Sequence, residues 1–144
     1  DRSRGLGDVY KRQHINKSFL KKLLKNNIIP VCCAVSHDGN GQLLNTNADT
    51  IASEIASALS ENFEVNLTYC FEKKGVLENI EDLNSVIPII NTKKYEELKN
   101  KGLIQAGMLP KLHNCYQALL KGVKEIRIGS FNILSENKHT KIVL

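Results

Sequence analysis

The alternation of short apolar runs with amphipathic segments is the feature that most constrains the fold of this chain. Apolar runs typical of strands cover residues 28–35, 63–71 and 123–129. Between them lie segments whose apolar side chains recur at helical spacing, which predicts helices over residues 19–26, 48–60, 93–101 and 108–120. Strands that alternate with helices in this way predict an α/β domain with a mainly parallel sheet.

Several details of this pattern predict where each element lies. The run Ile28–Val35 is apolar throughout, which is typical of a strand buried on both faces. Residues 86–90 are interrupted by Pro88 and are therefore at most an edge strand. Residues 141–144 are predicted to form a final edge strand, and Thr92 is predicted to cap the helix that follows it.

Composition excludes several other classes of protein. The 144 residues suit one domain, and the net charge of +5 is spread over mixed-sign helices, which argues against a nucleic-acid site. No apolar run approaches the roughly 20 residues that a membrane helix needs. The four cysteines form no C-x-x-C pair, so we expect reduced thiols, no metal site and a cytoplasmic setting. Cys32, Cys33 and Cys70 lie in apolar runs, where we expect them to act as small buried hydrophobes.

The first thirteen residues differ from all that follows. Residues 1–13 interleave Gly with Arg and show no amphipathic period, so we interpret them as a non-native or disordered leader. Residues 14–144 then form the folded domain.

The loop before the helix at residue 48 carries an unusual set of polar side chains. Asn45, Asn47 and Asp49 alternate just before that helix, where free backbone N–H groups converge. One helix cap needs one such residue, and here there are three. From the residues alone, a binding site and an ordinary cap are equally good interpretations.

Two further loops have compositions that suit a nucleotide. Residues 70–77 combine an aromatic residue, two lysines and a glycine, which can seat a purine with its phosphates, although a hairpin turn with solvated lysines is the commoner case. Lys111 falls in the first turn of a helix, where a cation is unfavourable unless an anion is also present. The chain has no Walker loop, no G-x-G-x-x-G and no G-x-S-x-G motif.

At these loops the sequence resembles the acetylglutamate kinases of the amino-acid kinase superfamily. The segments that carry the resemblance are IIPVCCAVSHDGNGQLLNTNADTIASEIASAL, VNLTYCFEKKGVL, IQAGMLPKLHNCYQALLKGV and, more weakly, VKEIRIGS. The N-x-N-A-D and G-M-x-x-K elements are specific in combination. The resemblance implies a three-layer αβα sandwich with a mainly parallel sheet, which is the C-terminal, ATP-binding half of the amino-acid kinase fold.

The resemblance also implies roles for individual residues. Lys111 and Asp49 would be catalytic: Lys111 would stabilise charge on the transferred phosphoryl group, and Asp49 would orient the catalytic lysines. Asn45 would bind the acylglutamate. The residues that would line the ATP pocket are Phe71, Glu72, Lys73, Gly75, Val76, Leu77, Leu103, Ile104 and Gln105. The reaction would be ATP-dependent phosphorylation, with Mg²⁺, of the γ-carboxylate of N-acetylglutamate or another N-acylglutamate in arginine biosynthesis.

The sequence also departs from the family pattern. The family's N-terminal half, with its glycine-rich loops, has no counterpart here, so we expect this chain to have negligible activity alone. His139 stands where a Gly-Thr-x-Ile element is expected to begin, and CFEKKG replaces the commoner Ser-Asp-x-x-G. The full-length enzyme is expected to be a homodimer. The alternatives are another amino-acid kinase, such as a carbamate, aspartate or uridylate kinase, and a non-catalytic nucleotide-binding module.

Overall fold

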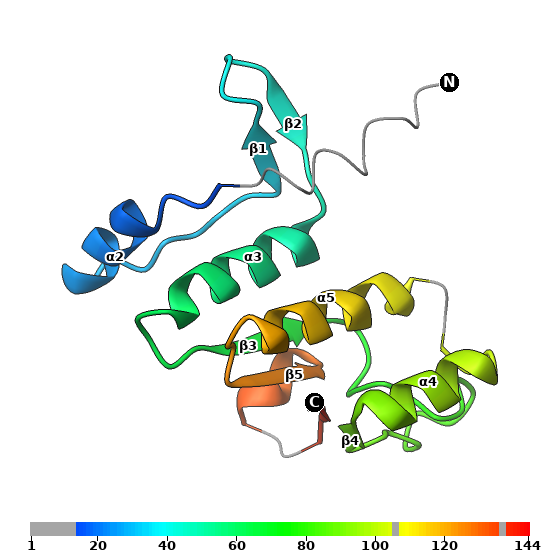
Figure 1. Cartoon of the computed structure of the whole chain (residues 1–144). Coiled ribbons are helices and arrows are strands. Elements are labelled where there is room, and N and C mark those ends of the chain that lie inside the picture. Colours follow the sequence, from blue (N-terminus) through cyan, green and yellow to red (C-terminus); the bar gives the residue numbers. More distant parts are fainter. Residues whose placement is uncertain (1–13, 105–106, 136–137) are drawn as a thin grey trace, which may run out of the picture. The chain divides into compact units, whose positions relative to one another are not determined.

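The computed structural model describes residues 14–104, 107–135 and 138–144, and the chain divides into two units (Figure 1). The first unit ends at Asn45 and the second runs from Thr46 to Leu144. The predicted leader, residues 1–13, lies outside the described residues.

The described part of the first unit contains one helix and one β-hairpin. Helix α2 spans Lys17–Lys25, and the side chain of Asn16 caps it by accepting a hydrogen bond from the backbone N–H of Phe19. Strands β1 (Val35–His37) and β2 (Leu43–Asn45) pair antiparallel. In the turn between them, the Asp38 carboxylate accepts the N–H groups of Asn40 and Gln42 at 2.7 and 3.1 Å.

The prediction of a buried strand over residues 28–35 is wrong. Only Val35 of this run belongs to a strand, and Ile29 and Val31 are 86% and 96% exposed. A strand buried on both faces needs a neighbour at each edge and a packed layer on each face. Within the described residues, β1 pairs with β2 alone, and residues 28–34 pair with no strand.

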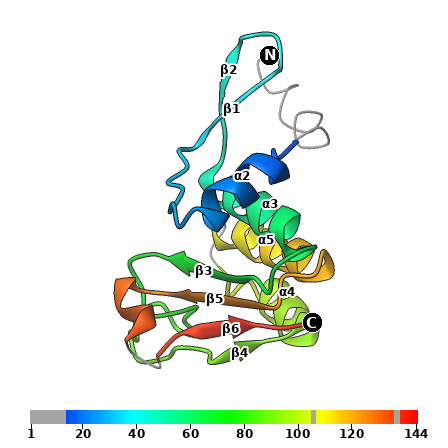
Figure 2. The ribbon, with the colours of Figure 1, turned by 90° about the vertical axis from the view of Figure 1, so that its left-hand side faces the viewer.

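The second unit is built on a four-stranded sheet in the order β3-β5-β6-β4 (Figure 2). Its strands are β3 (Asn66–Cys70), β4 (Ile89–Ile90), β5 (Glu125–Gly129) and β6 (Thr140–Ile142). The pairs β3–β5 and β4–β6 are parallel, and β5–β6 is antiparallel. The prediction of a mainly parallel sheet is confirmed, as is the edge position of the strand that follows Pro88.

Helices flank this sheet, which confirms the predicted α/β class. Helices α3 (Ala48–Ser60) and α5 (Met108–Leu120) pack side by side, α3 against β3 and α5 against β5 (Figure 1). Helix α4 (Thr92–Asn100) packs beside β4, and a short 3₁₀ helix, η2 (Phe131–Leu134), follows β5. Among the described residues, no helix is long and apolar enough to span a membrane.

The core of the second unit follows from the alternation within its strands. Ile126 and Ile128 on β5 are fully buried, while Glu125 and Arg127 between them remain partly exposed. Leu112 on α5 is also fully buried. Each such side chain contributes about 1.5–3 kcal/mol by leaving water.

Two smaller predictions need correction. Asn91, not Thr92, caps α4, because its side chain accepts the N–H of Lys94 at 2.8 Å and Thr92 is already helical. Strand β6 is not at an edge, since it lies between β5 and β4 with Thr140 and Ile142 fully buried.

The thiols were also assigned to the wrong environments. Cys32, Cys33 and Cys70 are free and exposed, whereas Cys115 on α5 is free and buried. Cys70 is the last residue of β3, and Cys32 and Cys33 belong to the run that pairs with no described strand.

Candidate functional site

The N-terminal ends of α3 and α5 meet at a contact between Asp49 and Lys111. The Nζ atom of Lys111 donates a hydrogen bond to Oδ1 of Asp49 at 2.6 Å, although the two residues are 62 positions apart in the chain. Their side chains are 14% and 29% exposed, so the pair is largely shielded from solvent. The structure thus brings together the two residues for which the resemblance implies catalytic roles. The roles themselves stay a prediction.

Asn47 is the residue that caps α3, a role for which the sequence offered Asn45, Asn47 and Asp49. Its side chain accepts the N–H of Thr50 at 3.1 Å and so caps α3. Asp49 is therefore not needed as a cap and is available for the contact with Lys111. Asn45 lies at the end of β2 in the first unit with an exposed side chain, and its predicted role in binding substrate stays a prediction.

The two charges differ in how they suit their helices. Both lie in a first turn, where the helix macrodipole favours the carboxylate of Asp49 and disfavours the ammonium of Lys111. The N-cap of α5 is Gly107, which supplies no capping side chain. This end of α5 therefore combines a cation with N–H groups that lack a side-chain acceptor, which is an arrangement suited to an anion.

Tyr69 is the residue at this site that the sequence interpretation missed. The Nζ atom of Lys111 lies 4.6 Å from the centre of its ring, and its hydroxyl donates a hydrogen bond to the backbone carbonyl of Asp49 at 3.0 Å. Burial raises the pKa of Tyr69 well above its ordinary value, and the neighbouring Cys115 and Asp49 add to the shift. Its position one residue before the end of β3 was the available signal, because ligands gather at the carboxyl ends of parallel strands.

A small cavity gathers most of the residues predicted to bind ATP. Its lining consists of Phe71, Lys73, Gly75, Val76, Leu77, Ile80, Leu103, Ile104 and Met108. Seven of these belong to the predicted set; Ile80 and Met108 were not predicted. Glu72 is outside the lining, with a side chain 80% exposed and 3.8 Å from the ammonium of Lys73. Gln105 lies outside the described residues.

This cavity lies next to the Asp49–Lys111 contact along α5. Met108 is the first residue of the helix and precedes Lys111 by three positions, so the two share one face. The cavity has a volume of about 40 Å³.

Close packing explains the glycine in the loop that forms one wall. A Cβ atom on Gly75 would lie 2.6 Å from Cγ1 of Val86 and 2.7 Å from Oγ1 of Thr140. The Thr140 hydroxyl accepts the N–H of Val76 at 2.8 Å and donates to the carbonyl of Ile87 at 2.7 Å. A single buried side chain thus ties this loop to the segment that leads into β4.

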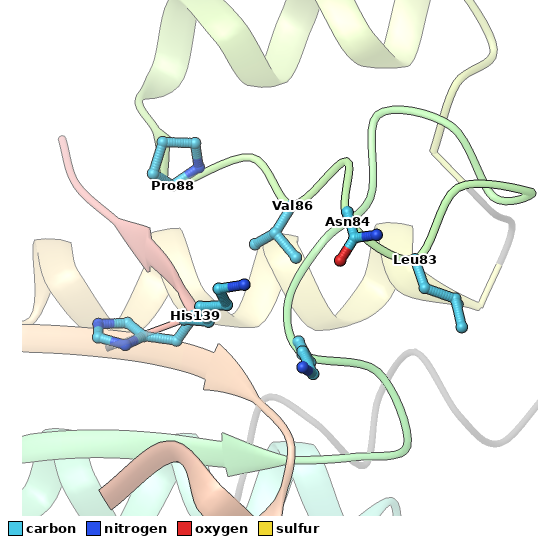
Figure 3. A pocket seen from close by; sticks show the side chains of 7 residues that line it. Leu83, Asn84, Val86, Pro88 and His139 are labelled. Atoms are coloured by element: carbon cyan, nitrogen blue, oxygen red, sulfur yellow. The ribbon is translucent and has the colours of Figure 1, made fainter. Parts of the chain in front are cut away.

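A second and larger cavity, of about 210 Å³, was not predicted (Figure 3). It is lined by Lys74, Leu83, Asn84, Val86, Pro88, Lys138 and His139. Figure 3 shows Leu83, Asn84 and Val86 on the segment before β4 and His139 on the segment before β6. The Nδ1 atom of His139 is buried and has no hydrogen-bond partner among the described atoms. Of the loop 70–77, predicted to seat a nucleotide, only Lys74 is among the residues that line this cavity.

Nothing in the described part of the chain groups three or more His, Cys, Asp or Glu side chains in a way that could hold a metal ion.

Comparisons with known proteins agree with this geometry. The model of the "Amino acid kinase family" matches residues 1–130. The chain is 49% identical to the acetylglutamate kinase of Cytophaga hutchinsonii, over 96% of this chain and 53% of that protein. It is 46% identical to the acetylglutamate kinase of Phocaeicola vulgatus, over 95% of this chain and 52% of that protein. The chain therefore spans about half the length of these relatives.

A solved structure is also similar to this chain in its fold. The crystal structure of smu.665 from Streptococcus mutans UA159 superimposes with a TM-score of 0.76 at 30% identity. The similarity covers 91% of this chain and 49% of that one.

Proposed function

Because this chain belongs to the amino acid kinase family, we propose that it is the nucleotide-binding half of an N-acylglutamate kinase. The complete enzyme would transfer the γ-phosphoryl group of ATP to the γ-carboxylate of N-acetylglutamate or N-succinylglutamate. The observation that carries this proposal is the contact between Lys111 and Asp49 at the N-terminal ends of two helices. The identity of 46–49% to two acetylglutamate kinases supports it.

Phosphoryl transfer to a carboxylate makes modest demands on the protein. The γ-carboxylate is already deprotonated at neutral pH, so no general base is needed. One carboxylate oxygen forms a bond to the γ-phosphorus while the bond from that phosphorus to the β–γ bridging oxygen breaks, giving ADP and an acyl phosphate. Alignment and neutralisation of charge then supply the catalysis. Mg²⁺ would arrive bound to the ATP phosphates.

Lys111 and Asp49 would divide this work. The ammonium of Lys111 would stabilise negative charge on the phosphoryl oxygens, assisted by the positive end of the α5 dipole. Asp49 would hold that ammonium in one orientation through the 2.6 Å hydrogen bond. Neither residue would remove a proton.

The apolar cavity beside Met108 would receive the adenosine. Leu77, Leu103 and Ile104 supply apolar walls, and Lys73 supplies a cation at the margin for a phosphate. Asn45 would contact the acylglutamate, and this contact would need the complete enzyme. We also propose that the complete enzyme is a homodimer formed through its other half.

Joining the chain to a donor half tests the proposal directly. The N-terminal half of the Cytophaga hutchinsonii enzyme, fused before His14, should yield ATP- and N-acylglutamate-dependent acyl phosphate, trapped with hydroxylamine as a hydroxamate. The 144-residue chain alone should yield none. Lys111→Ala in the chimera should lower kcat by about a hundredfold or more, while Lys124→Ala, which removes an exposed partner of Glu64, should not.

The outcomes separate the competing functions. A folded chimera that binds ATP but transfers no phosphate, beside an active donor enzyme, would refute the kinase proposal and favour a non-catalytic nucleotide-binding module. Transfer to carbamate or aspartate in place of N-acylglutamate would indicate another member of the family.

A further inference from the structure

Tyr69 contacts both members of the Lys111–Asp49 pair. Its ring lies against the Lys111 ammonium, with 4.6 Å between Nζ and the ring centre. Its hydroxyl donates to the backbone carbonyl of Asp49 at 3.0 Å. A single residue thus contacts the cation at the start of α5 and the backbone at the start of α3.

The ring adds to the stabilisation that the Asp49 carboxylate gives the buried Lys111 ammonium. Lys111 sits at the positive end of the α5 dipole and its side chain is mostly buried, so its charge is poorly solvated. The face of an aromatic ring attracts a cation through its quadrupole. Because the ring carries no net charge, it stabilises the ammonium without neutralising it. A second carboxylate in place of the ring would cancel the positive charge that an incoming phosphate needs.

Tyr69 is itself held rigidly. It is 5% exposed, and on β3 it pairs in register with Ile128 of β5, which is fully buried. Burial raises the pKa of its hydroxyl far above neutral pH, so the hydroxyl remains a hydrogen-bond donor. A side chain fixed in the sheet thereby fixes two groups that belong to different helices.

We propose that Tyr69 is a positioning residue for phosphoryl transfer, whose ring holds the Lys111 ammonium and whose hydroxyl holds the Asp49 backbone in one arrangement. The inference rests on the catalytic roles proposed for Lys111 and Asp49. The placement of Lys111 by the ring, however, is measurable without any activity.

The first experiment measures the reactivity of Lys111 in the 144-residue chain. The amines are acetylated with an N-hydroxysuccinimide ester at pH 8, and mass spectrometry follows Lys111 relative to the exposed Lys124. Tyr69→Leu removes the ring and should speed modification of Lys111 by about threefold to tenfold. Tyr69→Phe keeps the ring and should change it by less than about twofold.

A matched control separates this effect from a general loss of packing. Tyr116 is also buried, and its hydroxyl also donates to a backbone carbonyl, that of Ile90. Its ring packs against Tyr95, however, and among the described residues no lysine is recorded over it. Tyr116→Leu should leave the Lys111 rate unchanged. If Tyr69→Leu does not fold by circular dichroism, Tyr69→Met is the ring-free variant to use. Equal Lys111 rates in the ring-free and Phe variants, or the same increase in Tyr116→Leu, would overturn the proposal.

The second experiment uses the active chimera. Tyr69→Leu should lower kcat by about tenfold with the KM for ATP changed by less than about twofold, and Tyr69→Phe should restore most of kcat. A kcat unaffected by loss of the ring would overturn the positioning role. An unsubstituted chimera without activity would overturn the proposed function, and the Lys111 reactivity would then decide by itself whether the ring places the ammonium.

Discussion

The two units of the chain treat similar apolar sequence in opposite ways. In the second unit, Ile126 and Ile128 on β5 are fully buried between neighbouring strands and α5. In the first unit, Ile29 and Val31 belong to an equally apolar run, yet both are more than four-fifths exposed. An apolar run reports only that burial would be favourable. Whether burial occurs depends on the partners that the rest of the chain supplies.

One aspartate in each unit shows a related difference, in how far along the chain its hydrogen-bond partners lie. Asp38 in the first unit binds N–H groups two and four residues away, whereas Asp49 in the second unit binds a lysine 62 residues away. The contacts of Asp38 are thus local, whereas the contact of Asp49 joins distant segments of the chain. Four measurements would break or sharpen this contrast.

The thiols should show the largest difference. Cys32 and Cys33 are exposed, whereas Cys115 is buried. Burial raises the pKa of the Cys115 thiol to about 12. Since the thiolate is the reactive form, Cys115 should react with Ellman's reagent at pH 8 at least about a hundredfold more slowly than the exposed thiols. Urea should abolish the difference. Rapid reaction of Cys115 in the native chain, located by mass spectrometry, would show that α5 is not packed as described.

Truncation of apolar side chains should give the next largest effect. Ile128→Ala removes a fully buried side chain from β5 and should lower the free energy of unfolding by about 2–5 kcal/mol, measured by urea titration and circular dichroism. Val31→Ala, at a side chain 96% exposed, should change it by less than about 0.5 kcal/mol. Comparable losses at the two sites would contradict the contrast between the units.

A smaller effect is expected at the two aspartates. Asp49→Ala leaves the mostly buried Lys111 without its carboxylate and should lower the free energy of unfolding by about 1–3 kcal/mol. Asp38→Ala breaks only contacts within the hairpin turn and should leave the midpoint of the main urea transition unchanged. A larger shift for Asp38→Ala than for Asp49→Ala would mean that the local turn, not the distant pair, supports the fold.

The smallest effect concerns pH. Hydrogen bonds from Lys141 and Arg127 hold the pKa of Glu125 below its ordinary value. A lowered pKa contributes stability that is present above the unfolded-state pKa and is lost as pH falls through the folded-state pKa. Glu125→Gln should therefore lose less thermal stability than the unsubstituted chain on acidification from pH 6 to pH 3. Equal acid sensitivity of Glu125→Gln and the unsubstituted chain would refute the assignment.

Local patterns were enough to predict most of the second unit. Helical spacing located α3 and α5 closely, and alternation located β5, because each of these signals arises from a buried face within one element. The position of β6 was not predictable in this way. Three residues carry no period, and only pairing with β5 and β4 makes it an interior strand.

The candidate site shows the same division. Resemblance and loop position identified Asp49, Lys111 and most of the cavity lining before any geometry was known. Tyr69 and Met108 were missed because their importance lies in contacts that cross from one element to another.

The buried hydroxyl of Thr140 has a consequence for how a nucleotide could enter. It anchors Val76 to Ile87 with two hydrogen bonds, and Gly75 beside it has no room for even one more carbon atom. The 71–77 side of the small cavity is therefore held in place by hydrogen bonds and close packing. If adenosine binds there, this wall should keep its shape, and any adjustment to the base should come from other lining residues such as Leu103 and Ile104.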